Sequence, residues 1–197
     1  MPAAAADSVT VVMPCYNGAR YIREALASAV EQTLKPEAII VVDDGSTDDS
    51  ASIVREWATR YPDAGIRLIQ QANAGEPAAR NAGIKAATTK WVAQLDTDDW
   101  WDPRKLEMQV ATASDPQAPG GGDDCVLVHT GVIGHFPDGS TSPHDKPPTT
   151  DRVGWVTRAL LEPRSIGHPS IMVRRDALQR IGGYDASFKQ ACDLDLY

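Results

Sequence analysis

The chain has 197 residues, of which 42% are hydrophobic, and its 19 basic and 27 acidic residues give a formal net charge of -8. This length suffices to bury the core of one domain and is short for two. The acidic balance argues against a general nucleic-acid binder, so no nucleic-acid partner is expected.

Signals for export or membrane insertion are missing from the sequence. No apolar run reaches the roughly 20 residues of a membrane-spanning helix, and residues 3–6 lack the basic start and long apolar core of a secretory signal. The three cysteines have neither zinc-ligand spacing nor the pattern of a disulfide framework: Cys15, Cys125 and Cys192. These features favour a reducing compartment, and we expect a cytoplasmic protein.

The first half of the chain alternates strand and helix patterns. Short apolar, β-branched runs predict strands, and apolar residues at helical spacing predict helices between them. The expected strands are residues 9–13, 37–42, 65–70 and 91–95, and the expected helices are 19–33, about 53–61 and 76–87. Such alternation predicts an open, mostly parallel sheet covered by helices on both faces.

Polar residues follow three of these strands where each one ends, at 14–17, 43–44 and 96–99. Ligands of open α/β sheets bind at the carboxyl ends of the strands, so we expect a binding site there. The sequence has neither G-x-G-x-x-G nor G-x-x-x-x-G-K-[ST]. Phosphate groups of a ligand would therefore have to be held by a metal ion.

The strand over 91–95 ends in three carboxylates, Asp96, Asp98 and Asp99. Acids so close together repel one another, and a cation would neutralise them; Mg²⁺ or Mn²⁺ suits such oxygen ligands better than Zn²⁺. Asp96 and Asp98 point the same way if the extended conformation persists. A solvated acidic turn is the structural alternative, and Asp102 before Pro103 predicts a helix cap.

The second half is less regular. Residues 114–124 and 136–150 predict loops, the latter either a substrate lid or a disordered connection. Residues 125–133 and 170–173 predict strands, and residues 155–161 and 176–180 predict short helices, the last one stopped by Gly182-Gly183. An apolar pattern that begins near Asp193 is cut off by the end of the chain, so we expect a fragment of something longer.

Six segments occur in order: VTVVMPCYNGARYIREALASAVEQT, VVDDGSTDDS, NAGEPAARNAG, VAQLDTDDWWDPRKL, HPSIMVRR and ACDLDLY. Together they resemble the family 2 glycosyltransferases of the GT-A fold. The resemblance implies a Rossmann-like, open, mixed and mostly parallel sheet in a single domain over residues 1–197. Its nucleotide-binding half would be about 8–112 and its acceptor-side half about 123–197, with the C-terminal part missing.

The same resemblance implies an inverting, Mn- or Mg-dependent transferase of the hexosyltransferase type. The expected donor is a nucleoside diphosphate sugar, in the first place a UDP-sugar. The expected acceptor is a hydroxyl group of a glycan, a lipid-linked molecule or another compound, in polysaccharide or glycoconjugate synthesis. Peripheral association with the inner face of a membrane, through the missing regions, is compatible with this expectation.

The family pattern assigns roles to individual positions. Asp98 matches the metal ligand of the DxD motif, and Asp193 matches the general base. The positions expected to contact the donor are Pro14 and Tyr16 in the uridine pocket, Asp44 at the base, Asp96 at the ribose, and Arg80, which borders the donor. Cys192 stands where the family commonly has a glutamate before the base.

Each assignment has a structural alternative. Tyr16 could be an aromatic at a helix entrance, Asp44 a helix cap, and Arg80 a surface charge or ion pair. A metal role is open to His168 but is not assigned. Two other functional classes also stay open: a non-catalytic module that binds sugar nucleotides, and a haloacid dehalogenase type phosphohydrolase. The acidic motif of that phosphohydrolase class normally lies at the start of the chain, whereas here the acidic segment begins at Asp96.

Overall fold

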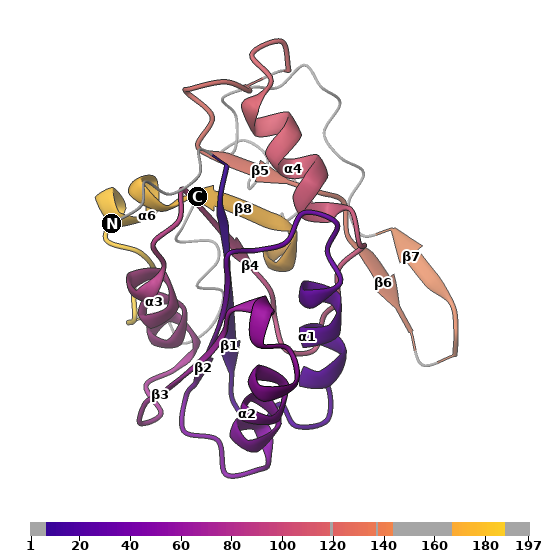
Figure 1. Ribbon diagram of the computed structural model, residues 1–197, viewed down its shortest axis with the longest axis vertical. Helices are drawn as coiled ribbons and strands as arrows, with labels where there is room; N and C mark the ends of the chain where they lie inside the picture. The colour runs from indigo at the N-terminus through magenta and orange to yellow at the C-terminus, as the bar shows by residue number, and fades with distance from the viewer. Residues whose placement is uncertain (1–6, 119, 137, 144–166, 188–197) are drawn as a thin grey trace.

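The computed structural model describes residues 7–118, 120–136, 138–143 and 167–187. Its main sheet has six strands in the order β3-β2-β1-β4-β8-β5, and a separate hairpin pairs β6 with β7 (Figure 1). The strands are β1 (Val9–Cys15), β2 (Ala38–Asp43), β3 (Ile66–Gln70), β4 (Trp91–Gln94), β5 (Leu127–His129), β6 (Ile133–His135), β7 (Thr141–Pro143) and β8 (Ile171–Arg174).

Parallel pairing joins β3, β2, β1 and β4, while β8 runs antiparallel to both β4 and β5. The mixed, mostly parallel sheet that the sequence predicts is therefore confirmed. The helices are α1 (Ile22–Val30), α2 (Ser50–Arg60), α3 (Glu76–Ala86), α4 (Lys105–Ser114) and α6 (Arg175–Ile181), with short 3-10 turns η1 (Pro62–Ala64) and η2 (His168–Ser170).

The central strands are apolar on both faces because helices cover both. All seven residues of β1 and all six of β2 are buried. Val11 and Met13 pack in one core with residues of α1, α2 and α4, whereas Val12 packs in the other with Ile84 of α3 and Leu178 of α6. Figure 1 shows these two groups of helices on opposite sides of the sheet. Such burial on both faces is typical of parallel strands.

Helix α3 lies unusually close to β1 because it carries a glycine at the contact. A Cβ atom at Gly83 would lie 2.4 Å from Cγ1 of Val12, closer than two carbon atoms can pack. Helix α6 ends as predicted, with Gly182 in the left-handed conformation at φ 87°.

The predicted strand over 125–133 is wrong in its extent. Strand β5 stops at His129, which pairs with Ile171, the first residue of β8, so the chain has no further partner in the main sheet. It leaves the main sheet and forms β6, which pairs with β7. The predicted loop over 136–150 is therefore wrong in part, because its first residues form the turn of the hairpin and Thr141–Pro143 form β7. Residues 144–150 and the helix predicted over 155–161 lie outside the described residues.

The predicted start of the helix after the acidic turn is also displaced. Helix α4 begins at Lys105 rather than at Pro103. Asp102 still acts as a local cap, because its Oδ1 accepts a hydrogen bond from the backbone N–H of Arg104 at 2.8 Å.

Candidate functional site

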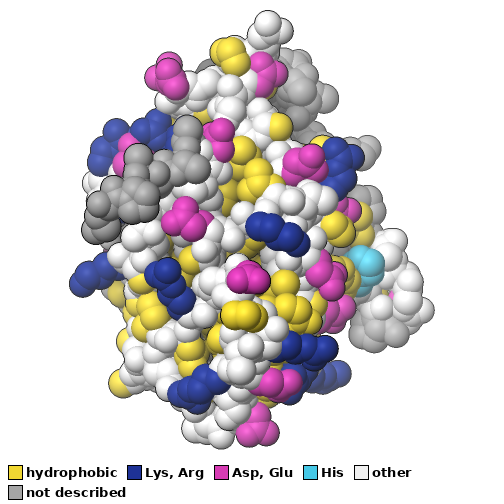
Figure 2. Space-filling view, viewed as in Figure 1, with side chains coloured by type: hydrophobic (Ala, Val, Ile, Leu, Met, Phe, Trp, Pro, Cys, Tyr) yellow, Lys and Arg dark blue, Asp and Glu magenta, His cyan; other side chains and the backbone are white. Residues whose placement is uncertain are grey.

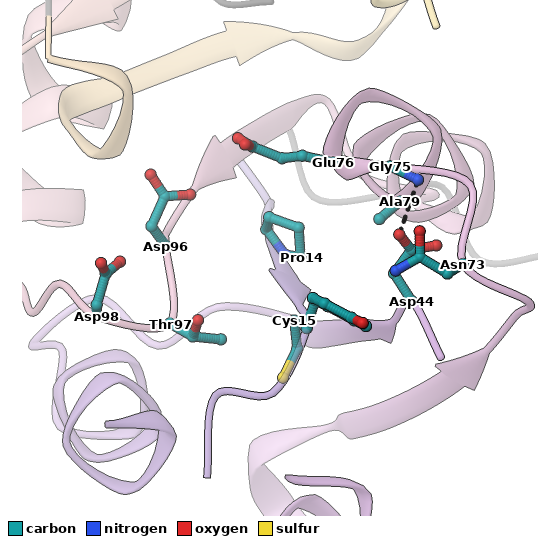
Figure 3. Close-up of a pocket in the computed structure, with 11 residues that line it drawn as sticks. Pro14, Cys15, Asp44, Asn73, Gly75, Glu76, Ala79, Asp96, Thr97 and Asp98 are labelled. Atoms are coloured by element: carbon teal, nitrogen blue, oxygen red, sulfur yellow. Dashed lines mark hydrogen bonds between the residues drawn. The ribbon is translucent and has the colours of Figure 1, made fainter. Parts of the chain in front are cut away.

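A pocket of about 580 Å³ opens at the carboxyl ends of β1, β2 and β4. β1 lies between β2 and β4, so the strand order reverses at this point, where open α/β sheets bind their ligands. Figure 3 shows side chains from several chain segments around the pocket. The lining residues are Pro14, Cys15, Tyr16, Asp44, Asn73, Gly75, Glu76, Ala79, Asp96, Thr97 and Asp98.

The turn after β1 is tied to the turn after β2. Three consecutive backbone N–H groups, at residues 17–19, donate to side chains of the second turn: Ser46 Oγ at 2.9 Å, Ser50 Oγ at 2.9 Å and Asp48 Oδ2 at 3.0 Å. Consecutive free amides of this kind can cradle a phosphate. Since these three are already occupied, the turn does not provide a phosphate cradle, which agrees with the missing glycine-rich motif.

Asp44 is buried at the edge of the pocket, and the loop after β3 surrounds its carboxylate. Oδ1 accepts hydrogen bonds from Gln71 Nε2 at 2.7 Å and from the N–H of Ala74 at 2.9 Å. Oδ2 accepts one from the N–H of Gly75 at 2.8 Å, the bond drawn in Figure 3. Asp44 therefore anchors this loop and does not cap α2, whose N-terminus has no side-chain cap.

The acidic residues after β4 form a tight turn, not an extended strand. The N–H of Asp99 donates to the carbonyl of Asp96 at 3.2 Å. The carboxyl groups of Asp96 and Asp98 nevertheless point to the same side in Figure 3. Burial, together with the charges of Asp96 and Asp98, raises the pKa of Asp99 to about 6. The cluster is therefore self-repelling, and a divalent cation would relieve that repulsion.

The described residues contain no group of three or more His, Cys, Asp and Glu side chains arranged to hold a metal ion. Mg²⁺ and Mn²⁺ do not require one, because they commonly take one or two protein carboxylates and complete their shell with water and phosphate oxygens. Asp98, which is exposed, and Asp96, which is partly exposed, fit this pattern.

Arg80 lies beneath the pocket and is not among its lining residues. Its guanidinium is 1% exposed and donates to Asp96 Oδ1 at 2.5 Å and to Gln94 Oε1 at 3.1 Å. Glu76 accepts from its Nε at 3.0 Å. Burial alone would lower the pKa of Arg80, but the neighbouring charges of Asp96 and Glu76 hold it raised. The ion-pair alternative therefore describes Arg80 in this structure, and direct donor contact stays a prediction.

Asn81 connects α3 to the segment after α6. Its side chain donates to the carbonyl of Tyr184 at 2.8 Å and accepts from the N–H of Tyr184 at 2.9 Å. The hydroxyl of Tyr184 lies 2.8 Å from Nε2 of His168. Burial, and then the charge of Arg80, lowers the pKa of His168 to about 2. His168 is thus a buried, neutral partner of Tyr184.

The structure brings together five of the residues that the sequence singles out: Pro14, Tyr16, Asp44, Asp96 and Asp98. Tyr16 is 55% exposed and lines the pocket, so it is not packed at the entrance of α1, and its contact with a base stays a prediction. Asp193 lies outside the described residues. Sequence reasoning missed Asn73 and Glu76. Their only signal is that Asn73 follows a predicted strand and Glu76 begins the next predicted helix, on the same sheet edge.

Basic, acidic and apolar side chains are interspersed on the face shown in Figure 2. Among the described residues, no helix is long and apolar enough to span a membrane.

Residues 10–182 match the model of the family described as glycosyl transferase family 2. The chain belongs to this family. Among curated relatives, it is 44% identical over 99 residues to the uncharacterized glycosyltransferase alr2836 of Nostoc sp., and 40% identical over 107 residues to the uncharacterized glycosyltransferase YibD of Escherichia coli. These matches cover 50% and 54% of the chain but 30% of each relative, so the chain spans only part of their length.

Solved structures support the fold. TarS 1–349 from S. aureus superposes with a TM-score of 0.68 at 23% identity, over 94% of this chain and 52% of that one. The mannosyltransferase PcManGT from Pyrobaculum calidifontis, in complex with GDP-Man and Mn²⁺, gives a TM-score of 0.66 at 26% identity, over 93% of this chain and 50% of that one. TarS 1–349 has also been solved with UDP and with UDP-GlcNAc.

Proposed function

We propose that this chain binds a nucleoside diphosphate sugar together with a divalent cation, Mn²⁺ or Mg²⁺, and transfers a hexosyl group to an acceptor hydroxyl with inversion. UDP-sugar is the proposed donor. The glycosyltransferase family is established by the family match; the donor, the metal, the stereochemistry and the hexosyl group are our proposals. Residues of about 8–112 would bind the nucleotide, and residues of about 123–197 would face the acceptor.

One observation carries the proposal: carboxylates from the ends of β2 and β4 share a pocket with Tyr16 at the end of β1. An exposed aromatic ring can cover a base, and a buried carboxylate can accept its N–H. The carboxylates after β4 can ligate a cation, and that cation can bind the diphosphate of the same ligand. The occupied amides of residues 17–19 leave phosphate binding to such a cation.

The residues of the chain then take separate tasks. Tyr16 and Pro14 would flank the base, Asp44 would accept its N–H, and Asp96, fixed by Arg80, would contact the ribose. Asp98 would ligate the cation, which when bound supplies positive charge that stabilises the departing diphosphate. The complex of PcManGT with GDP-Man and Mn²⁺ supports a sugar nucleotide and a divalent cation as the ligands of this pocket.

A single side-chain base is sufficient for this transfer. A glycosidase needs a second carboxyl group to protonate its leaving alkoxide, whereas a nucleoside diphosphate leaves as a stable anion. We propose Asp193 as that base: it would take the proton of the acceptor hydroxyl as its oxygen attacks the anomeric carbon opposite the diphosphate. In-line displacement of this kind inverts the anomeric centre.

The acceptor would be a glycan, a lipid-linked molecule or another hydroxyl compound, used at the cytoplasmic face of a membrane or in the cytoplasm. The chain spans part of its relatives, so the remaining length of a longer protein would contribute to acceptor choice.

Calorimetric titration with UDP, with and without MnCl₂, tests the proposal. We expect measurable UDP binding that depends on Mn²⁺, and no hydrolysis of a generic phosphatase substrate such as p-nitrophenyl phosphate. Phosphatase activity that is lost in Asp96→Asn would instead favour the phosphohydrolase class. Asp96 is a poor candidate for its nucleophile, because one of its oxygens is held by Arg80.

Transfer itself separates an enzyme from a binding module. A version of the protein that continues beyond residue 197 should release UDP from a UDP-sugar in the presence of acceptor, and Asp193→Asn should nearly abolish that release with UDP affinity kept. Metal-dependent UDP binding without any turnover would favour the non-catalytic module.

A further inference from the structure

The carboxylate of Asp44 has nearly all of its acceptor capacity filled by the protein itself. A carboxylate offers about four lone-pair positions, two on each oxygen. Gln71 Nε2 and the N–H of Ala74 occupy Oδ1, and the N–H of Gly75 occupies one position on Oδ2. Among the described residues, this leaves one acceptor position, on Oδ2, in a side chain that is 3% exposed and lines the pocket.

Nucleobases differ in the number of adjacent donors that they present to such a group. Uracil and thymine present one imide N–H between two carbonyl groups. Guanine presents a ring N–H beside an amino group, two parallel donors that fit the two oxygens of one carboxylate. Cytosine and adenine present an amino donor beside a ring nitrogen that accepts hydrogen bonds, and the lone pair of that nitrogen would face the oxygen lone pairs of the carboxylate. These patterns lie on the Watson–Crick edges by which proteins read unpaired bases.

We propose that Gln71, by occupying Oδ1 of Asp44, is the residue that makes the pocket prefer a base with a single imide N–H, uracil or thymine, over guanine. The inference rests on the proposed function, that this pocket holds a nucleoside diphosphate. Gln71 closes Oδ1, so only Oδ2 can accept from a base. A guanine placed there would leave its second donor unpaired in a desolvated site, and leaving a buried donor without a partner costs binding.

Gln71 is held in position for this task. It follows β3 directly, and its own N–H donates to the carbonyl of Asp43 at 3.0 Å, so the β2–β3 ladder fixes its backbone. Its side chain is half-buried. The other group on Oδ1 is the backbone N–H of Ala74, which side-chain replacement does not remove, so Gln71 is the partner through which Oδ1 can be opened.

Asn73 provides a contrast within the same loop. Its exposed side chain lines the pocket, and its amide can donate to a base carbonyl. Uracil, thymine and guanine all carry a carbonyl beside the relevant N–H, so this contact would not distinguish them. Loss of the Asn73 amide should therefore weaken all three nucleotides alike, whereas loss of the Gln71 amide should change their ratio.

Titration calorimetry with UDP, TDP, GDP and CDP, each with excess MnCl₂, tests the inference on the parent chain and on Gln71→Ala. We expect the parent to bind UDP and TDP at least about tenfold tighter than GDP and CDP, the size of one bidentate base contact. Gln71→Ala should reduce the UDP-to-GDP affinity ratio by about tenfold. Asn73→Ala should weaken UDP and GDP by similar factors, and the exposed Gln179→Ala should change neither.

Gln71→Met is a second variant, which keeps the length of the side chain and loses its donor; thermal melts followed by circular dichroism establish that each variant folds. Equal affinity of the parent for UDP and GDP would overturn the inference alone, as would a parental ratio in the folded Gln71 variants. Absence of binding by all four nucleotides would overturn the proposed function, and this inference with it.

Discussion

Arg80 donates from Nη2 to Oδ1 of Asp96 at 2.5 Å, and this contact joins helix α3 to the acidic turn after β4. The two residues differ in exposure: the Arg80 side chain is 1% exposed, and that of Asp96 is 25% exposed and reaches the pocket. The buried guanidinium of Arg80 thus holds Oδ1 of Asp96 from beneath the pocket and leaves Oδ2 for a ligand. The position of the proposed ribose contact is therefore set by a residue that lines no part of the pocket.

Arg80→Met tests this relationship. The change leaves Asp96 without its partner, and removal of one member of a buried pair costs about 3–5 kcal/mol. Because Asp96 is partly exposed, water compensates in part, and we expect a loss of about 2–3 kcal/mol in the free energy of unfolding. Urea denaturation measures it.

Arg23→Met is the matched control. Arg23 pairs with Glu56 at 3.0 Å, but both side chains are more than half exposed. The free energy of unfolding of Arg23→Met should stay at the parental level, since exposed ion pairs contribute little. Equal losses in the two variants would contradict a special role for the Arg80–Asp96 pair.

Asp98→Asn should remove the dependence of UDP binding on Mn²⁺. Asp98 is exposed, and the substitution keeps its shape and removes one charge from a self-repelling cluster, so the melting temperature should not fall. An amide lacks the negative charge that binds a hard divalent cation. Calorimetry with UDP, with and without MnCl₂, gives the result.

Asp102→Asn is the control for Asp98→Asn. Asp102 is also an exposed acid in this part of the chain, but its contact is with the N–H of Arg104. It should keep Mn²⁺-dependent UDP binding. Unaltered metal dependence in Asp98→Asn would assign the cation to other residues.

Local patterns in the sequence are enough to predict the first half of the fold. β1, β2 and β4 are rich in apolar residues, and a polar turn follows each of them. Both the strands and the convergence of Pro14, Asp44 and Asp96 therefore follow from chain order. Asp98 follows in the same way from the acidic end of β4, whereas the proposed contact of Tyr16 with a base came from the resemblance to a family; the structure places both residues at the pocket.

Contacts between distant residues were not accessible in this way. Asn81 binds Tyr184 across 103 positions, and no periodicity in either segment signals that pairing. Burial of Arg80 could not be foreseen either, because an alanine-rich helix has no charged face that marks its orientation. The end of β5 depends on where β8 begins, more than 40 residues later, which is why the predicted strand over 125–133 was too long.

Gly83→Ala should destabilise the protein although alanine favours helices. The added Cβ would lie 2.4 Å from Cγ1 of Val12, and overpacking of a core costs about 1–3 kcal/mol, more than the helix gains. Val12→Ala creates space at the same contact. The double variant should lose less unfolding free energy than the sum of the losses in the two single variants, by at least about 0.5 kcal/mol. Strict additivity would show that α3 shifts away instead.

His168 should make the protein less stable as the pH falls. Its side chain is 8% exposed, and its Nδ1 has no hydrogen-bond partner in the described part of the chain. Burial, and then the charge of Arg80, depresses its pKa to about 2 in the folded state, whereas an unfolded chain has a histidine pKa of about 6.5. The unfolded state alone therefore takes up the proton in the window between these two values, and acid favours unfolding.

The stability that His168 contributes is complete above pH 6.5 and is lost progressively below it, by about 1–2 kcal/mol at pH 5. His168→Gln does not titrate and can still bond to the Tyr184 hydroxyl, so its unfolding free energy should fall less than that of the parent between pH 7 and 5. His135→Gln, at an exposed histidine, should keep the parental slope. Urea denaturation at pH 7, 6 and 5 measures how the unfolding free energy changes with pH in the parent and in the two variants. The acidic residues contribute equally to this slope in all three proteins, so only the difference between the slopes reports on His168. A slope in His168→Gln equal to that of the parent would mean that the folded protein accommodates the charged imidazole.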